Sequence, residues 1–162
     1  MSELARVAGV GAGTLYEYFA TREDVIRGVE QRSWSTAVAD CEAMMRELDG
    51  CPIGEAIVKL VEFGVQMTRD RAALHGITLP ADPVDLAQRR VLIDGIVAVA
   101  VSRLEGHDLL PKNRLLAVRL VVKAVFAMCL LGMRDEPELV ISGEYGHELG
   151  LMMARYLVRT DI

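Results

Sequence analysis

The chain has 162 residues, with 18 basic and 23 acidic side chains and a net charge of −5, so it is not a uniformly basic nucleic-acid-binding protein. Its hydrophobic content of 52% excludes a disordered chain, and its length suits one domain or a small domain joined to a larger one. The three cysteines are odd in number and lack metal-type spacing, which favours a reduced, cytoplasmic setting over a disulfide framework.

The most apolar stretch runs from Leu115 to Met133 and carries Arg119 and Lys123 near its middle. Each of these charges would cost about 2.5–3.5 kcal/mol at the centre of a bilayer. Residues 1–10 also lack the basic start and apolar run of a signal peptide. We therefore expect a cytoplasmic protein with no membrane partner.

Two short helices are predicted at the N-terminus, over Ser2–Ala8 and Ala12–Phe19. The turn between them, Gly9-Val10-Gly11, has glycine where a left-handed backbone is often needed. A helix, a short turn with glycine and a second helix form the pattern of a helix-turn-helix motif.

The second short helix has two different sides. At about 100° per residue, Leu15 and Phe19 fall together on the inward side. The other side and its margins carry a glycine, a hydroxyl, an acid and two phenols: Gly13, Thr14, Glu17, Tyr16 and Tyr18. A helix that enters a DNA groove can use these groups, since glycine allows close approach, the hydroxyls reach phosphate oxygens and Glu17 can accept from a cytosine amino group. Arg22, at the start of the next helix, is placed to contact the phosphate backbone.

Longer helices are predicted for the rest of the chain, because no window has the alternation of a strand. Thr21-Arg22-Glu23-Asp24 is close to a capping box, and Pro111 suits the first turn of a helix. The long helices are expected over residues 22–48, 53–74, 84–104, 112–133 and 138–158. The predicted fold class is all-α.

The N-terminal region resembles the DNA-binding motif of TetR-family transcriptional regulators over residues 1–34. The matching residues are Glu3-Leu4-Ala5-x-x-Ala8-Gly9-Val10-x-x-Gly13-Thr14-Leu15-Tyr16-x-Tyr18-Phe19-x-x-Arg22-Glu23-Asp24. The resemblance implies that six positions contact DNA, namely Gly13, Thr14, Tyr16, Glu17, Tyr18 and Arg22. It also implies that residues 35–162 form a helical ligand-binding and dimerisation domain.

The family's three-helix domain normally begins with another helix and a basic arm, which do not precede the first short helix here. We expect either that residues upstream of Met1 are missing from this sequence or that the motif is truncated, which would leave Leu4, Leu15 and Phe19 partly unsupported. Residues 1–34 hold four arginines against five acidic side chains. Because DNA affinity depends on phosphate neutralisation, this region by itself is expected to bind DNA poorly.

The interior is predicted to be rich in methionine, a flexible side chain that accommodates varied apolar ligands. The resemblance implies an effector pocket among the middle helices, with the candidates Trp34, Phe63, Met67 and Phe126. Core packing is the alternative for each. Glu144-x-x-His147 is a single copy of a spacing that di-iron bundles use twice, so no metal, cofactor or catalytic residue is predicted.

Small residues recur along the last predicted helix, at Gly143, Gly146, Gly150 and Ala154. A glycine inside a helix costs about 1 kcal/mol relative to alanine, so these glycines require a reason such as the close approach of another helix. The preceding helix is apolar nearly all round. The two helices are therefore predicted to form half of a four-helix interface in a homodimer, as the resemblance also implies, with intrachain packing as the alternative.

We expect a homodimeric, ligand-responsive transcriptional regulator, and a repressor rather than an activator. Its recognition helices would enter successive major grooves of a near-palindromic operator, about 34–36 Å apart. A small, largely apolar effector would release it from double-stranded DNA by binding one conformation better than the other. The alternative from another class is a small-molecule-binding helical bundle with a vestigial DNA-binding motif, and a metal-dependent enzyme comes third.

Overall fold

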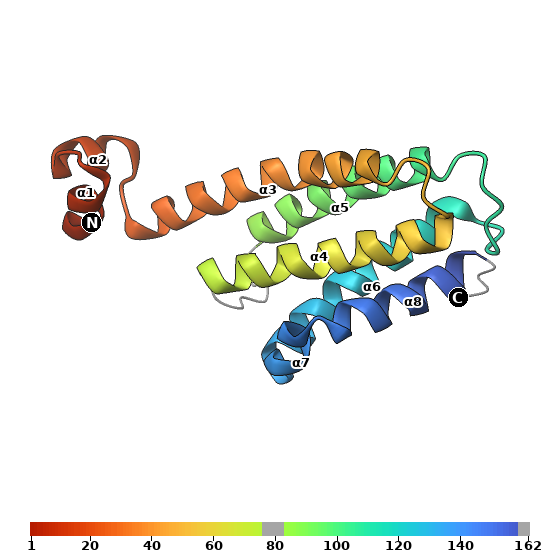
Figure 1. The fold of residues 1–162 in the computed structure, drawn as a ribbon. Coiled ribbons are helices and arrows are strands. Elements are labelled where there is room, and N and C mark those ends of the chain that lie inside the picture. Colours follow the sequence, from red (N-terminus) through yellow and green to blue (C-terminus); the bar gives the residue numbers. More distant parts are fainter. Residues whose placement is uncertain (76–82, 159–162) are drawn as a thin grey trace. The chain divides into compact units, whose positions relative to one another are not determined.

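The computed structural model describes residues 1–75 and 83–158, without the side chains of residues 30, 33–35, 71–75, 83–86 and 88. Every regular element in that part of the chain is a helix, which confirms the all-α fold class (Figure 1). The helices in chain order are α1 (Ser2–Ala8), α2 (Ala12–Tyr18), α3 (Arg22–Glu47), α4 (Ile53–His75), α5 (Pro83–Arg103), α6 (Arg114–Asp135), α7 (Pro137–Ser142) and α8 (Glu144–Leu157).

The helices belong to two compact units, Met1–Ala37 and Val38–Ile162. The first unit holds α1, α2 and the first part of α3, and the second holds the remainder of α3 and all later helices. Because α3 is one continuous helix from Arg22 to Glu47, it contributes to both units.

The start of α3 is fixed by the predicted capping box. The Thr21 hydroxyl oxygen accepts a hydrogen bond from the Asp24 backbone N–H at 3.1 Å, and the Asp24 carboxylate accepts one from the Thr21 N–H at 2.9 Å. These reciprocal bonds satisfy backbone donors at the helix start. The hydrogen bonds from Thr21 also hold the pKa of Asp24 below its ordinary value.

The predicted start of the sixth helix is wrong by two residues. Pro111 lies outside the helix, and Asn113 is the N-cap, since its side-chain oxygen accepts from the Leu116 N–H at 3.0 Å. A side-chain acceptor at the cap satisfies one of the backbone donors at the helix start that have no intrahelical partner. The helix therefore begins at Arg114 and continues to Asp135.

The last predicted helix is two helices, because the chain breaks at Gly143. This residue has φ of +89°, a left-handed conformation that favours glycine, and it separates α7 from α8. Beyond the break, the Tyr145 hydroxyl donates to the Met128 carbonyl of α6 at 2.8 Å. The break thus turns the chain back along the bundle and ties the start of α8 to α6.

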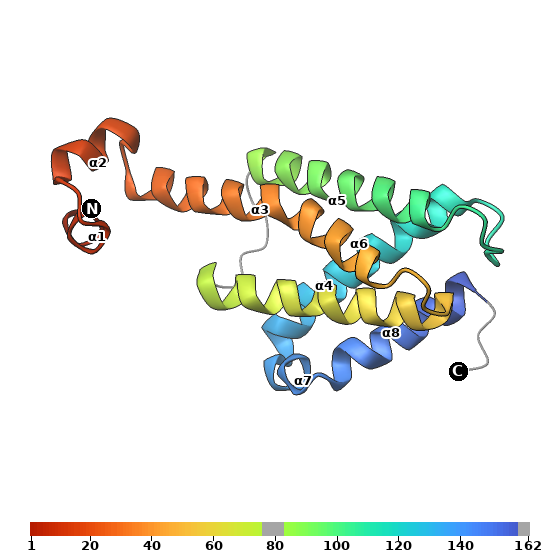
Figure 2. The same ribbon diagram turned by 45° about the horizontal axis from the view of Figure 1, so that its top comes forward.

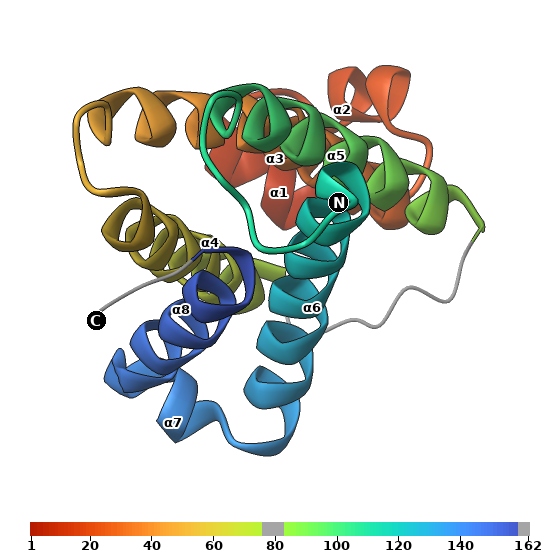
Figure 3. The same cartoon turned by 90° about the vertical axis from the view of Figure 1, so that its right-hand side faces the viewer.

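The core of the second unit consists of two clusters of buried side chains. The larger cluster joins α4, α6 and α8 through residues such as Val61, Val121 and Leu149, and Figure 3 shows these three helices side by side. The smaller cluster joins the end of α3 to α5 and α6 through Met45 and Val97, among others, and Figure 2 shows α3 alongside α5. Helix α6 contributes side chains to both clusters and therefore connects α4 and α8 with α3 and α5.

The small residues of α8 lie against α4 of the same chain. A Cβ atom on Gly146 would lie 3.4 Å from the Glu62 Cα, and one on Gly150 would lie 2.9 Å from the Val58 Cα. Ala154 is fully buried in the larger core cluster. The close approach that these residues allow is therefore an intrachain one, the alternative left open by the sequence.

Among the described residues, α6 is the helix with the length and composition of a membrane span, a weak indication because core helices of soluble proteins meet the same criteria. Its Arg119 donates to the Asp94 carboxylate of α5 at 2.6 Å. Leu116, Leu120 and Leu131 of the same helix are exposed. The helix thus combines an ion pair to its neighbour with an exposed apolar face.

Candidate nucleic-acid interface

The turn between α1 and α2 is built by backbone hydrogen bonds. Gly9 adopts a left-handed conformation with φ of +69°, its N–H donates to the Arg6 carbonyl at 3.3 Å, and the Val10 N–H donates to the Ala5 carbonyl at 3.0 Å. This pair of bonds is the Schellman arrangement, which ends a helix and sets the direction of the chain after it. The two short helices are therefore joined by a defined turn.

The faces of α2 are distributed as the helical spacing predicts. Leu15 is half-buried, as is Phe19 directly after the helix, whereas Gly13, Thr14 and Glu17 are exposed. Tyr16 and Tyr18 are 54% and 78% exposed. The outward side of α2 thus presents a hydroxyl, a carboxylate and two phenols to its surroundings, around a glycine.

Phe19 anchors the end of α2 to α3. A Cβ atom on Gly28 would lie 3.1 Å from a ring carbon of Phe19, so the absence of a side chain at Gly28 leaves room for this ring. Sequence reasoning missed Gly28 as a determinant of the motif. A glycine inside a predicted helix, where it is unfavourable by itself, was the signal that could have identified it.

The arginines of this unit differ in their surroundings. Arg6 donates two hydrogen bonds to Glu3, at 2.6 and 2.9 Å, and thereby lowers the pKa of Glu3. Arg27 lies 3.1 Å from the Asp24 carboxylate. Arg22 is exposed at the first position of α3. Among the described residues, no ion pair like those of Arg6 and Arg27 is found for Arg22.

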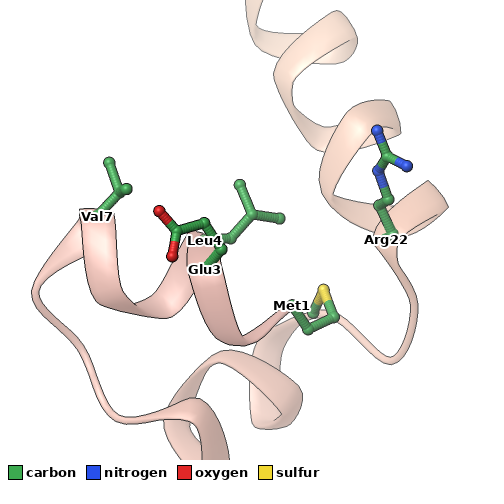
Figure 4. A pocket seen from close by; sticks show the side chains of 5 residues that line it. All are labelled: Met1, Glu3, Leu4, Val7 and Arg22. Atoms are coloured by element: carbon green, nitrogen blue, oxygen red, sulfur yellow. The ribbon is translucent and has the colours of Figure 1, made fainter.

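An apolar groove of about 360 Å³ lies between α1 and the start of α3. Figure 4 shows Leu4 and Val7 on one side of α1, with Arg22 across the groove on α3 and Met1 between them. Leu4 and Val7 are exposed, and Ala5 is the buried residue of α1. Leu4 and Val7 are therefore exposed apolar side chains of the N-terminal unit.

The predicted effector residues lie in the second unit or near its boundary. Phe63 and Met67 are one turn apart on α4, and both are half-buried. The half-buried Phe126 ring on α6 has the Arg89 guanidinium carbon 4.9 Å from its centroid, a contact that sequence reasoning missed. The side chain of Trp34 lies outside the described residues. An effector site at these residues stays a prediction.

In the described part of the chain, no three His, Cys, Asp or Glu side chains gather in a group that could hold a metal ion. The His147 Nδ1 atom lies 2.8 Å from a carboxylate oxygen of Glu62, which ties α8 to α4. Burial raises the pKa of both Cys41 and Cys129 to about 11, which disfavours their reactive thiolate forms.

Comparison with known proteins gives two relatives, the uncharacterized HTH-type transcriptional regulators MT1294 and Rv1255c of Mycobacterium tuberculosis strains CDC 1551 / Oshkosh and ATCC 25618 / H37Rv. Each is 27% identical over 141 residues, which cover 85% of this chain and 68% of the relative. No family model matches the chain, and no solved structure matches it significantly. The chain is thus distantly similar to helix-turn-helix transcriptional regulators over most of its length.

Proposed function

We propose that the protein is a transcriptional regulator of the TetR type, which binds a near-palindromic operator as a homodimer. Residues 1–34 form its DNA-binding region and residues 35–162 its ligand-binding and dimerisation domain. It acts in the cytoplasm as a repressor, without enzymatic activity, and a small, largely apolar effector releases it from DNA.

The observation that carries this proposal is the exposed side of α2. Thr14, Tyr16 and Tyr18 are exposed while Leu15 and Phe19 face the protein, an arrangement that suits a helix lying in a major groove. The distant similarity to proteins named as helix-turn-helix transcriptional regulators supports the same function.

Each candidate residue has a distinct role in the proposed complex. Gly13 allows the helix to approach the bases, and Thr14 and the two tyrosines contact phosphate oxygens. Glu17 accepts a hydrogen bond from a cytosine amino group and so contributes to sequence preference. Arg22 contacts the phosphate backbone and contributes to affinity for every sequence.

Binding of the purified chain to labelled duplexes from the region upstream of its own gene tests the proposal. Arg22→Ala should weaken binding to all duplexes and reduce its salt dependence, because one phosphate contact is lost. Glu17→Gln should change the ranking of duplexes, with a difference of about 1–3 kcal/mol at one base pair. Fluorescence anisotropy across a series of salt concentrations measures both effects.

Arg90→Ala is the matched control, since Arg90 is a highly exposed arginine on α5, in the other unit. Its affinity for DNA should equal that of the unchanged protein. Absence of DNA binding at any salt concentration, together with binding of apolar small molecules, would instead identify a ligand-binding bundle with a vestigial motif.

The homodimer has a candidate surface in the exposed apolar side chains of the last helices. Leu116, Leu120 and Leu131 of α6 are exposed, as are Met152 and Tyr156 of α8. Exposed apolar side chains of this kind are typical of protein interfaces, and a twofold dimer would bury the same residues on both copies.

Sedimentation analysis of two variants tests this interface. The unchanged protein should sediment at twice the chain mass of 17.8 kDa, whereas Leu120→Glu should sediment as a monomer because it places two charges in the contact. Val91→Glu is the control, since Val91 is a more exposed apolar residue that belongs to α5 and not to these two helices. A monomeric unchanged protein would contradict the dimer.

A further inference from the structure

One side of helix α5 faces the core of the second unit. Ile93, Val97 and Ala100 lie on this side, at the intervals of three and four residues that place side chains on one face of a helix. Val97 is 1% exposed, and Ile93 packs against the same cluster of buried side chains. Arg89 is four residues before Ile93, so a guanidinium takes the next position of an apolar stripe.

The helices on either side of the cluster remain in contact one turn beyond it. Leu60 of α4 and Val122 of α6 pack, like Ile93, against the smaller core cluster. Four residues after Leu60, a Cβ atom on Gly64 would lie 3.8 Å from a methyl carbon of Val125 on α6, which is ordinary contact. Helices α4 and α6 thus meet at the level of the Arg89 position on α5.

The side chains at this level are half-buried, in contrast to the buried cluster. Phe63 precedes Gly64 on α4, and Phe126 follows Val125 on α6. The Arg89 guanidinium carbon lies 4.9 Å from the centroid of the Phe126 ring, and the Arg89 Nε atom is buried. A cation over an aromatic ring within about 6 Å is attracted by it. This level therefore combines partly exposed aromatic side chains with one positive charge.

A charged side chain at this position costs more free energy than an aliphatic one, because its charge loses contact with water. The guanidinium of arginine stays protonated and carries five N–H donors in a planar fork that matches a carboxylate. Five donors can serve a ligand in addition to protein groups. Binding of an acidic ligand would therefore give a reason for the arginine on this side of α5.

We propose that Arg89 binds the acidic group of the effector, and that the effector is a largely apolar molecule with one carboxylate. Its apolar part lies against Phe63, Met67 and Phe126, and its carboxylate accepts two parallel hydrogen bonds from the guanidinium. This inference rests on the proposed function, which assigns an effector to these helices, and it adds the charge that the effector carries.

Isothermal titration calorimetry with matched acids and amides tests the proposal. Octanoate and naphthalene-2-carboxylate are the acids, and their primary amides are neutral molecules of similar shape. The unchanged protein should bind at least one acid about tenfold more tightly than its amide, because a hydrogen bond between charged groups contributes more than a neutral one. Arg89→Met, which keeps a long side chain beside Phe126, should abolish this preference. Arg89→Lys should retain part of it, because it keeps the charge but loses the planar fork.

Arg90→Met is the matched control, since Arg90 is the next residue and its side chain is 84% exposed. This variant should bind the acid and the amide with the same ratio of affinities as the unchanged protein. A merely structural role of Arg89 would change both affinities alike and leave their ratio intact. Circular dichroism verifies that every variant is equally helical.

The proposal is overturned if the unchanged protein binds neither acid more tightly than its amide, or if Arg89→Met keeps the preference. The regulator function is tested separately, by anisotropy with the DNA duplexes in the absence and presence of the acid. DNA binding without a preference for acids would leave the regulator function standing and remove the acid site. A preference that depends on Arg89, in a protein that binds no duplex, would support the acid site and contradict the regulator function.

Discussion

The two units of this protein hold their helices in different ways. Among the described side chains of residues 1–29, Ala5 is the buried one, and the structure there relies on a glycine turn, a capping box and the contact of Phe19 with α3. In residues 38–158, two clusters of buried side chains fix the helices against each other. Local hydrogen bonds thus define the first unit, and packing of apolar surface defines the second.

This difference determines which substitutions matter in each unit. In a packed core, one additional methyl group forces neighbours to move, because interiors are close-packed. On an exposed helix, the same methyl group meets no neighbour and raises helix propensity. The comparison of the two units can therefore be tested with identical chemical changes in both.

The largest effect is expected from glycine-to-alanine substitution. Gly150→Ala should lower the free energy of unfolding by about 1–3 kcal/mol or more, because its Cβ would lie 2.9 Å from a backbone atom of Val58. Gly13→Ala should not lower it, since a Cβ at Gly13 meets nothing within 4 Å. Urea unfolding followed by circular dichroism measures both. Equal destabilisation by the two variants would contradict the contrast between the units.

A pH-dependent effect is expected from the buried thiols of the second unit and its boundary helix. Burial raises the pKa of Cys129 from 9.0 to about 11. Between these values the unfolded chain loses the thiol proton first, so the folded state becomes less stable as pH rises from about 9 to about 11. Urea unfolding at both ends of this range should show the loss of stability.

Cys129→Ala should reduce this pH dependence, even if its cavity lowers stability at every pH. Cys51→Ala is the control, because Cys51 is only partly buried, and it should retain the dependence of the unchanged protein. The interpretation would be wrong if the two variants behaved alike.

The smallest effect is expected from removal of helix caps. Thr21→Ala and Asn113→Ala each remove a side-chain acceptor for a backbone N–H, at a cost of about 1 kcal/mol. Because the first unit has so little core, Thr21→Ala should accelerate hydrogen exchange across α1, α2 and the start of α3. Asn113→Ala should affect only the first turn of α6, whose later turns are packed. If Asn113→Ala instead accelerated hydrogen exchange along the whole of α6, the two units would not differ in their response to the loss of a cap.

The sequence alone predicted features that depend on a few neighbouring residues. The bounds of α1, the glycine turn, the start of α3 and the exposed side of α2 follow from short-range spacing and capping chemistry. Helix periodicity likewise predicted the all-α class. These features need no knowledge of distant residues, because the hydrogen bonds that form them join residues at most five positions apart.

Other features depended on which helices meet. The four small residues at the end of the chain predicted a contact surface for a second copy, yet Gly143 breaks the helix and Gly146 and Gly150 lie against α4. Residue spacing shows that one side of a helix carries small residues, but it does not identify the helix that packs against that side. Pro111 likewise lies outside α6, because the side chain of Asn113 caps the helix.

By itself, the sequence determined the helical class, the turn at Gly9 and the division of α2 into an inward and an outward side. Only the tertiary structure decided that α8 packs its glycines on α4, that Phe19 lies at Gly28 and that Val38 meets Gly95. The physical reason is range: capping and periodicity act within a few residues, whereas close packing depends on the shapes of surfaces that the fold brings together from distant parts of the chain.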